Sequence, residues 1–338
     1  HAPLLGSSLS WALTIHAPTG IKLKQAGIPF TIYEKNEGLG GTWFENDYPD
    51  CGVDVQSQLY SFSFEPEPPG GWSQFFAKRD ELLGYLDYCA DKYAVREHIQ
   101  FGTSVESAAF EDGRWQVTTA GAAAGTSAFS VFVSCVGQLN RPSIPPLSGA
   151  ETFEGDAFHT ARWEGRDLTG KRVALIGTGC SAVQTLRTTA QKAEHVYVFQ
   201  RTPNWIVENP NYYKQVPPWM QTVFDHVPLA LKAYRRKLWL TSEANYLNIA
   251  KDKDWPAWLH GAIETLFPIK TGDGEMQKDL VAWIQARCGD DEEGRALAAA
   301  CTPEYPVSAA MVGLGCDCCR RSDGRPLLRT ALLQACGY

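Results

Sequence analysis

The chain has 338 residues, of which 44% are hydrophobic and 20% charged, and its formal net charge is −7. These values are typical of a globular protein long enough for two domains, and the negative charge argues against a nucleic-acid partner. We find no recognisable signal peptide and no apolar run of the roughly 18 residues that cross a membrane. The ten cysteines have no disulfide-framework or zinc-site spacing, which favours reduced thiols. We expect a cytoplasmic protein without a metal site or a membrane partner, and the sequence does not indicate its oligomeric state.

The first readable element is half of a dinucleotide-binding unit. The stretch IKLKQAG predicts the end of a helix capped by Gly27, and a strand over residues 30–33 follows and ends on Glu34. An acidic residue at the end of this second strand typically binds ribose hydroxyls. We therefore expect Glu34 to contact a dinucleotide.

The preceding residues do not complete that unit. A G-x-G-x-x-G turn should lie about 20 residues before the acid, where glycine lets the backbone approach a pyrophosphate. Trp11, Leu13 and His16 stand at the three glycine positions. We interpret residues 1–20 as foreign to this fold, with a divergent loop as the alternative.

The middle of the first half predicts regular structure. RDELLGYLDYCADKYAV has the spacing of an amphipathic helix, whose apolar positions are Leu82, Leu83, Leu86, Cys89 and Tyr93. Residues 105–110 and 115–119 flank an EDG turn and predict a β-hairpin. Residues 129–136 predict a buried strand, and the prolines of the stretch 142–146 predict a linker.

A second nucleotide-binding pattern follows the linker. An apolar strand over residues 173–176 runs into Gly177, Thr178 and Gly179, and a helix opens at Ser181. Backbone amides and the helix dipole at such a turn attract a phosphate, and glycine allows its close approach. A glycine pattern alone is weak evidence, but its position between a strand and a helix is the expected context.

The next strand, HVYVFQ, is followed by Arg201 and Thr202. The adenosine ribose should lie at this strand end, where an acidic residue favours NAD and an arginine favours the 2′-phosphate of NADP. The alternative is a solvated surface arginine. We expect an NADP site.

Several motifs resemble those of a known family. Phe153, Gly155, His159 and Trp163 form the pattern F-x-G-x-x-x-H-x-x-x-W, and further matches are GLGGTWFENDYP, DVQSQLYSFSF, VSCVGQLNRPSIPPLSG and FQRTPNW. From about Ile21 to Pro306 the sequence resembles the type I Baeyer–Villiger monooxygenases and the related flavin-containing monooxygenases.

The resemblance implies an α/β fold with two Rossmann-like domains and a helical insertion. It places an FAD-binding domain at residues 1–145, an NADP-binding domain at 146–212, the insertion at 213–302 and an aberrant tail at 303–338.

The resemblance also implies cofactor contacts. Those on the FAD side are Glu34, Gly40, Gly41, Thr42, Trp43, Asp54, Tyr60 and Val105, and those on the NADP side are Gly177, Thr178, Gly179, Ser181, Ala182, Gln184, Arg201 and Thr202. Asp54 matches an aspartate that faces the nicotinamide and partners an active-site arginine. The plain alternative is that the glycines form turns and the aromatics belong to a core. Asp50 departs from the pattern, since relatives usually carry glycine there.

His159 and the residue pair at positions 310 and 311 bear on catalysis. The resemblance implies that His159 belongs to a linker that couples movement of the NADP domain to the flavin, and we favour this conformational role over proton transfer. Relatives carry a lysine–arginine pair after C-x-P-x-Y-P-V, but this chain has Ala310 and Met311 there. Met311 cannot compensate a negative charge as the arginine does. Beyond that point the tail resembles nothing in the family, and the family's C-terminal part is missing.

The expected function is an FAD- and NADPH-dependent monooxygenase. It would insert one oxygen atom of O₂ into a small-molecule ketone to give an ester or lactone, or oxygenate a soft nitrogen or sulfur atom. The alternative is an inactive truncated remnant that retains only an NADP-binding unit. A flavin disulfide reductase is disfavoured because Cys51 has no near cysteine partner. The sequence does not identify the substrate.

Overall fold

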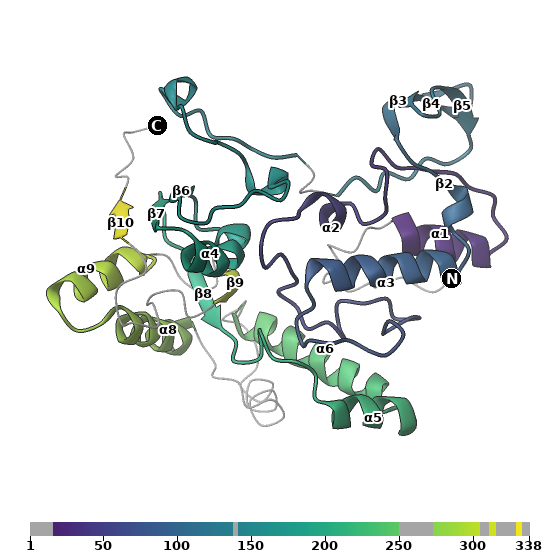
Figure 1. Ribbon diagram of the computed structural model, residues 1–338. Coiled ribbons are helices and arrows are strands. Elements are labelled where there is room, and N and C mark those ends of the chain that lie inside the picture. The colour runs from purple at the N-terminus through teal and green to yellow at the C-terminus, as the bar shows by residue number, and fades with distance from the viewer. Residues whose placement is uncertain (1–15, 138–140, 250–272, 305–310, 316–328, 333–338) are drawn as a thin grey trace. The chain divides into compact units, whose positions relative to one another are not determined.

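The computed structural model describes residues 16–137, 141–249, 273–304, 311–315 and 329–332 (Figure 1). This part of the chain combines helices with short strands, as predicted for an α/β fold, and it divides into two compact units. Unit 1 holds the described residues up to Asp47, together with Tyr60–Trp72 and Ala77–Glu164. Unit 2 holds Tyr48–Leu59, Ser73–Phe76 and the described residues from Gly165 onward. The domain boundaries drawn from cofactor binding stay a prediction.

The helices of unit 1 follow the apolar spacing of the sequence. They are α1 (His16–Gln25), α2 (Thr42–Glu45) and α3 (Arg79–Lys92), with 3₁₀ turns η1 (Arg96–His98), η2 (Ala150–Thr152) and η3 (Thr160–Arg162). The predicted amphipathic helix is α3, which buries Leu82, Tyr85, Leu86, Cys89 and Ala90. Gly27 follows α1 at φ 68°, the left-handed conformation expected of a glycine cap.

The strands of unit 1 form two small sheets. In the first, β1 (Ile32–Tyr33) pairs in parallel with β2 (Ile99–Gln100). In the second, β3 (Thr103–Glu111), β4 (Arg114–Gly121) and β5 (Gly125–Phe129) are antiparallel. Phe110 pairs with Trp115 across the turn, so the predicted hairpin is confirmed.

The prediction of a buried strand over residues 129–136 is wrong. Phe129 ends β5, and residues 130–137 form no strand. Val131, Val133 and Val136 are 71%, 55% and 66% exposed. An apolar strand is buried only when neighbouring strands and helices cover it, and this run has no strand partner within the described chain. Its composition shows that it can be buried but not that a partner is available.

The hydroxyl of Tyr85 binds one tight turn of unit 1, which Phe62 and Glu65 close. It donates to the carbonyl oxygen of Glu65 at 2.6 Å and accepts the backbone N–H of Phe62 at 2.8 Å. Its ring packs against Trp72 with centroids 5.0 Å apart, and both side chains are fully buried. The helix thereby satisfies two buried backbone groups that have no place in regular structure.

Unit 2 is built on a parallel βαβ unit. β6 (Arg172–Ile176) leads through α4 (Cys180–Lys192) to β7 (His195–Gln200), and β6 and β7 pair in parallel (Figure 1). β10 (Arg329–Leu332) lies on the other edge of β7, also in parallel. Leu186 and Ala190 of α4 pack with Val196 and Val198 of β7. The strands and helix predicted for this half are confirmed.

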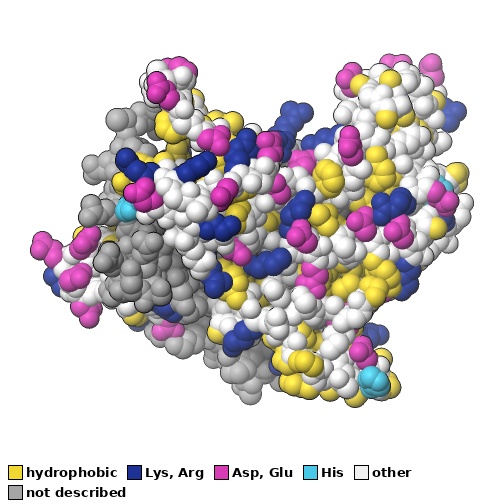
Figure 2. Space-filling view, viewed as in Figure 1, with side chains coloured by type: hydrophobic (Ala, Val, Ile, Leu, Met, Phe, Trp, Pro, Cys, Tyr) yellow, Lys and Arg dark blue, Asp and Glu magenta, His cyan; other side chains and the backbone are white. Residues whose placement is uncertain are grey.

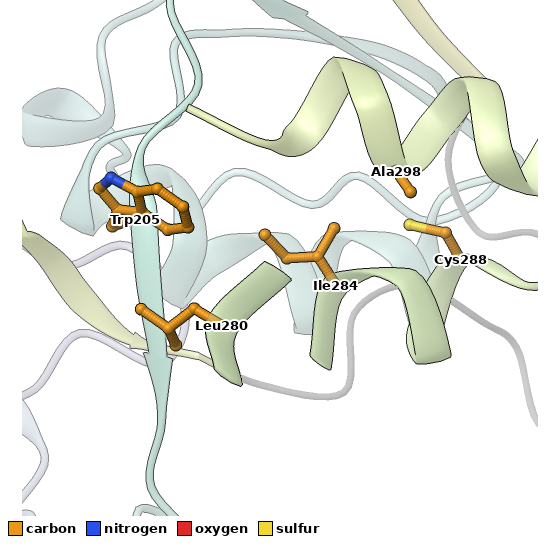
Figure 3. Packing of buried hydrophobic residues seen from close by; sticks show 5 residues of the cluster. All are labelled: Trp205, Leu280, Ile284, Cys288 and Ala298. Carbon is orange, nitrogen blue, oxygen red and sulfur yellow. The ribbon is translucent and has the colours of Figure 1, made fainter. Parts of the chain in front are cut away.

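The rest of unit 2 is largely helical. It contains β8 (Trp205–Glu208) in parallel with β9 (Met311–Gly315), and the helices α5 (Pro218–His226), α6 (Ala230–Ile249), α8 (Asp273–Cys288) and α9 (Glu292–Cys301). Helices α6 and α8 lie within the stretch 213–302, where the sequence predicts a helical insertion. Trp205 is fully buried against Leu280 and Ile284 of α8, in a cluster that includes Cys288 and Ala298 (Figure 3).

Helix α5 and the turn after it carry exposed apolar side chains, and Figure 2 shows yellow atoms where α5 lies in Figure 1. Trp219 is 68% exposed and Leu229 is 73% exposed. No helix within the described ranges combines the length and apolarity needed to span a membrane.

We predict that Tyr85→Phe lowers the free energy of unfolding by about 1–3 kcal/mol, because it leaves the Glu65 carbonyl and the Phe62 N–H buried without their partner. Tyr88→Phe is the matched control, since the half-buried Tyr88 hydroxyl bonds only side chains. Urea denaturation of the two variants measures the difference. Equal losses in the two variants would contradict the role given to Tyr85.

Candidate functional site

The glycine turn of unit 2 has the local geometry of a phosphate site. Gly177 has φ 104°, and its N–H donates to the carbonyl oxygen of Phe199 at 2.8 Å, which fixes where the turn leaves β6. Gly179 is the N-cap of α4 and provides no capping side chain. A Cβ atom added to Gly177 or Gly179 would meet nothing within 4 Å. The turn therefore has room at these two glycines, as the close approach of an anion requires.

Arg201 and Thr202 lie beside this turn in the sheet order. Ile176 at the end of β6 pairs with Phe199 near the end of β7, so both strands end at the same sheet edge. Arg201 and Thr202 follow β7 directly and are exposed. An exposed guanidinium at this edge suits a charge-assisted contact with phosphate.

Asn204 is a residue of this site that the sequence reasoning missed. Its Nδ2 atom donates to the carbonyl oxygen of Thr178 at 2.9 Å and to the hydroxyl oxygen of Thr178 at 3.0 Å. The signal in the sequence was weak, since a polar residue shortly after a strand is common. Only its place before the buried Trp205 could have marked it.

The side chain of Gln184 forms several hydrogen bonds within unit 2. Its Nε2 atom donates to the carbonyl oxygen of Gly52 at 2.9 Å and to Oδ1 of Asp54 at 3.0 Å, and its Oε1 atom accepts the Tyr48 hydroxyl at 2.9 Å. The side chain is only 4% exposed. The predicted contacts of Gln184 and Asp54 with a cofactor stay predictions, but the structure joins these two residues to each other.

Tyr48 is a neutral donor in this arrangement. Burial raises the pKa of Tyr48 well above its usual range, and a hydrogen bond with Ser181 acts in the opposite direction. Ser181 thus bonds a protein side chain at the start of α4. Ala182 follows it in the same helical turn and is half-buried.

Asp50 makes a second connection between the Tyr48–Leu59 segment and α4. Asp50 has φ 61°, a left-handed conformation that is strained for a residue with a Cβ atom. Glycine adopts this conformation without strain and therefore suits this position. Its carboxylate accepts the Thr188 hydroxyl at 2.5 Å. This contact with α4 is one that glycine could not make.

The residues predicted for the flavin side lie around α2 in unit 1. Gly40 and Gly41 have φ of 123° and 50° and precede Thr42, the first residue of the helix. The φ of Gly40 is one that side chains rarely adopt, and an added Cβ atom would also lie 2.4 Å from Cδ2 of Leu83, so both backbone strain and contact with α3 favour glycine here. The glycine pair is therefore also explained by the alternative that these glycines only form a turn.

Trp43 and Tyr60 are brought together in unit 1. Trp43 is 6% exposed and meets the Tyr60 ring edge-on, with centroids 5.8 Å apart. The indole Nε1 of Trp43 is buried with no acceptor in the described part of the chain. A buried donor of this kind is rare in native proteins and fits an acceptor atom supplied by a ligand.

Glu34 and Val105 occupy the β1 side of unit 1. Glu34 is 7% exposed, and its Oε1 atom accepts the N–H of Asn36 at 2.9 Å. Its carbonyl oxygen accepts the N–H of Thr103, which holds the start of β3 beside it. Val105 lies on β3 and is 39% exposed. The Gly-rich half that should accompany them is not seen: Trp11 and Leu13 lie outside the described residues, and His16 is the first residue of α1.

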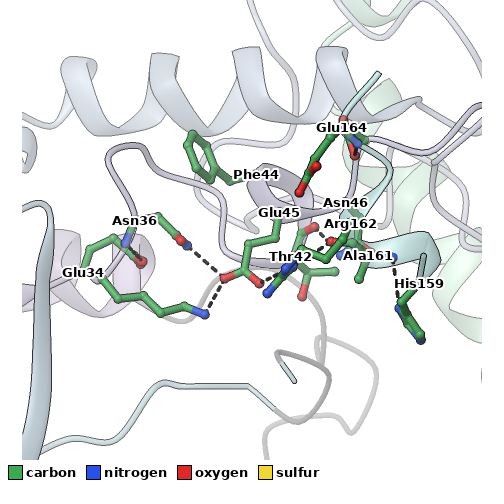
Figure 4. A network of polar contacts seen from close by, with 12 residues as sticks. Glu34, Asn36, Thr42, Phe44, Glu45, Asn46, His159, Ala161, Arg162 and Glu164 are labelled. Atoms are coloured by element: carbon green, nitrogen blue, oxygen red, sulfur yellow. Dashed lines mark hydrogen bonds and ion pairs between the residues drawn. The ribbon is translucent and has the colours of Figure 1, made fainter. Parts of the chain in front are cut away.

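Charged groups meet at Glu45, the last residue of α2 (Figure 4). Its Oε1 atom lies 2.7 Å from the Lys35 ammonium and accepts Nδ2 of Asn36 at 3.1 Å, and its Oε2 atom lies 3.7 Å from the Arg162 guanidinium. Burial alone would raise the pKa of Glu45, but the bonds from Lys35 and Asn36 outweigh it and hold the pKa below its ordinary value. Arg162, from the histidine motif, therefore contacts the segment that holds Trp43.

The histidine of the motif caps a 3₁₀ turn. Nδ1 of His159 accepts the N–H of Ala161 at 3.1 Å at the start of η3 (Figure 4). Trp163 is 5% exposed and packs edge-on against Phe158, and the N–H of Glu164 donates to Asp47 at 3.2 Å. Nδ1 of His159 is thus used within the turn, and the conformational role of this residue stays a prediction. Only the backbone of Met311, the first residue of β9, is described, and Ala310 lies outside the described residues.

The residues that the structure describes include no group of three or more His, Cys, Asp or Glu side chains placed to hold a metal ion.

We predict that Gln184→Leu lowers the free energy of unfolding by about 1–3 kcal/mol, because it leaves the Gly52 carbonyl and the Tyr48 hydroxyl without this partner. Gln285→Leu, at an exposed position of α8, is the control and should change the free energy little. Guanidinium denaturation measures both. A loss for Gln184→Leu no larger than that of the control would show that the amide network contributes nothing to stability.

We predict that the ion pairs of Glu45 stabilise the fold only above a pH threshold. A carboxyl whose folded pKa is depressed contributes stability above its unfolded pKa of about 4.3, and loses it as pH falls through the lower folded value. Glu45→Gln should therefore destabilise the chain at about pH 7, and the difference from the unsubstituted chain should shrink below about pH 4. Urea titrations at several pH values test this, and a difference that stays constant over that range would refute it.

Comparison with known proteins places the chain in a family. The model of the flavin-binding monooxygenase-like family matches residues 23–227, more than half of the chain. A Baeyer-Villiger monooxygenase of Streptomyces coelicolor is 37% identical over 223 residues, which are 65% of this chain and 42% of that protein. The chain thus spans less than half the length of this relative.

Solved structures agree with the fold. The open crystal structure of cyclohexanone monooxygenase superposes with a TM-score of 0.72 at 26% identity, over 96% of this chain and 66% of that chain. A crystal structure of OTEMO in complex with FAD and NADP superposes with a TM-score of 0.70 at 26% identity, over 90% of this chain and 61% of that chain. By the match over residues 23–227, the chain belongs to the flavin-binding monooxygenase-like family.

Proposed function

We propose that this chain serves FAD- and NADPH-dependent monooxygenation, in which one oxygen atom of O₂ is inserted into a ketone to give an ester or lactone. The observation that carries the proposal is the glycine turn of unit 2, where Cβ atoms added to Gly177 and Gly179 would meet nothing within 4 Å and Arg201 follows a strand that ends at the same sheet edge. The names of the relatives support the reaction class, since they include a Baeyer-Villiger monooxygenase and cyclohexanone monooxygenase. Oxygenation of a soft nitrogen or sulfur atom is the second substrate class that we retain.

The residues of unit 2 fit an NADP molecule. The amides at the start of α4 would receive the pyrophosphate, and Arg201 with Thr202 would receive the 2′-phosphate. NADPH supplies the hydride that reduces the flavin when both are bound. The protein's part is to hold the dinucleotide in one orientation and to favour the 2′-phosphate over a bare ribose hydroxyl.

The residues of unit 1 fit one end of an FAD molecule. The buried Nε1 of Trp43 offers a donor, and Glu34 offers a carboxylate to ribose hydroxyls. FAD supplies the chemistry with O₂ when bound. The segment that would receive its pyrophosphate lies outside the described residues, so no contact is derived for it.

The second candidate is a non-catalytic NADP-binding protein. Two observations favour it: Val131, Val133 and Val136 are exposed although the sequence predicts a buried strand there, and Met311 stands at the position of the family's arginine. This candidate requires only the βαβ unit of unit 2.

We propose the cytoplasm as the compartment, because Cys89 and Cys135 are thiols and no described helix could span a membrane. Burial raises the pKa of the Cys89 thiol to about 12, which keeps it unreactive.

The decisive measurement is the visible spectrum of the purified chain after incubation with FAD and desalting. A retained flavin band near roughly 450 nm that NADPH bleaches is the expected result for a flavin monooxygenase. A colourless protein whose melting temperature rises with NADPH would favour the non-catalytic NADP-binding protein. A colourless protein that NADPH does not stabilise would remove both candidates.

A further inference from the structure

The side chain of Asn204 binds both the backbone and the side chain of Thr178, in the glycine turn of unit 2. Its amide nitrogen donates one bond to the Thr178 carbonyl oxygen and one to the Thr178 hydroxyl oxygen, at 2.9 and 3.0 Å. Both hydrogens of the amide nitrogen are therefore used on a single residue. A free turn rich in glycine would sample several peptide orientations, and this pair of bonds selects one of them.

The selected orientation favours anion binding. In a trans peptide group the C=O and N–H bonds point in opposite directions, so a Thr178 carbonyl turned toward Asn204 directs the N–H of Gly179 away from it. The Thr178 hydroxyl oxygen accepts from Asn204 and keeps its own hydrogen to donate. Two donors of the turn are thus left for a ligand, on a turn where the added Cβ atoms would meet nothing within 4 Å.

Asn204 is itself fixed by the residue that follows it. Trp205 has no exposed surface and packs on Leu280 and Ile284 of α8, in the cluster that also contains Ala298 of α9 (Figure 3). A side chain next to such an anchor has little freedom to leave the turn. The helices α8 and α9 thereby support a site to which neither contributes a ligand.

We propose that Asn204 is a positioning residue, which fixes Thr178 and Gly179 for the pyrophosphate of a dinucleotide and transmits the support of the α8–α9 cluster to that turn. The inference rests on the proposed NADP site and adds a residue that acts through Thr178 without touching the 2′-phosphate. It predicts that loss of the Asn204 amide weakens the binding of NADP⁺ and NAD⁺ alike, because both contain the pyrophosphate.

The test compares dissociation constants of NADP⁺ and NAD⁺ by calorimetry with the full chain. Asn204→Ala should raise both constants by the same factor of about tenfold, as expected for the loss of two neutral hydrogen bonds. Arg201→Ala should weaken NADP⁺ more than NAD⁺, because only NADP⁺ carries the 2′-phosphate. Asn209→Ala should change neither constant, since Asn209 closes a separate turn on the N–H of Asn211.

A double variant tests the route of the effect. Asn204→Ala combined with Thr178→Val should weaken binding by less than the product of the two single effects, because both substitutions remove part of the same interaction. If the double variant weakens binding by the full product of the two single effects, Asn204 does not act through Thr178 and the inference is overturned. If Asn204→Ala does not fold, as judged by its melting curve without ligand, Asn204→Ser is measured in its place against the same two constants.

The remaining outcomes separate this inference from the proposed function. Unchanged constants in Asn204→Ala would overturn the inference and leave the NADP site intact. A loss confined to NADP⁺ would also overturn it, since Asn204 would then read the 2′-phosphate. If the unsubstituted chain binds neither dinucleotide, the proposed function fails and the inference fails with it.

Discussion

The parallel pairing of β6 with β7 is the constraint on which the proposed nucleotide site of unit 2 depends. Parallel strands cannot be joined by a tight turn, so the chain must cross from the end of one strand to the start of the next, and α4 makes that crossing. The glycine turn and Arg201 come from positions far apart in the sequence but follow strands that end at one sheet edge. Gly177 is fixed to this edge by its bond to Phe199.

The parts that the sequence predicted correctly are those encoded locally. The run before Gly177, the turn and the amphipathic α4 are each determined by neighbours a few residues away, and so is the hairpin of β3 and β4. The stretch at residues 130–137 has the composition of a buried strand, but burial requires partners that composition cannot specify. The bonds of Gln184 to Asp54 and of Asn204 to Thr178 join residues distant in sequence, so no local pattern contains them.

In unit 1, the histidine motif forms local contacts that its sequence pattern does not reveal. His159 caps a short turn, and this turn presents Arg162 to Glu45. Glu45 ends the helix that carries Trp43, and its charge is maintained by Lys35 and Asn36. The histidine is thus one support of an electrostatic contact within unit 1.

The interleaving of the two units along the chain limits how this protein can be divided. The Tyr48–Leu59 segment belongs to unit 2, although more than a hundred residues separate its end from Gly165, where the continuous part of that unit begins. A polypeptide that starts at Gly165 would contain the whole βαβ unit but would lack Tyr48, Gly52 and Asp54. Gln184 would then face solvent or collapse onto other groups, and no single proteolytic cut would release either unit in complete form. Dissection into isolated cofactor domains therefore requires that this segment be supplied again, either as a separate peptide or by a rearranged order of the chain.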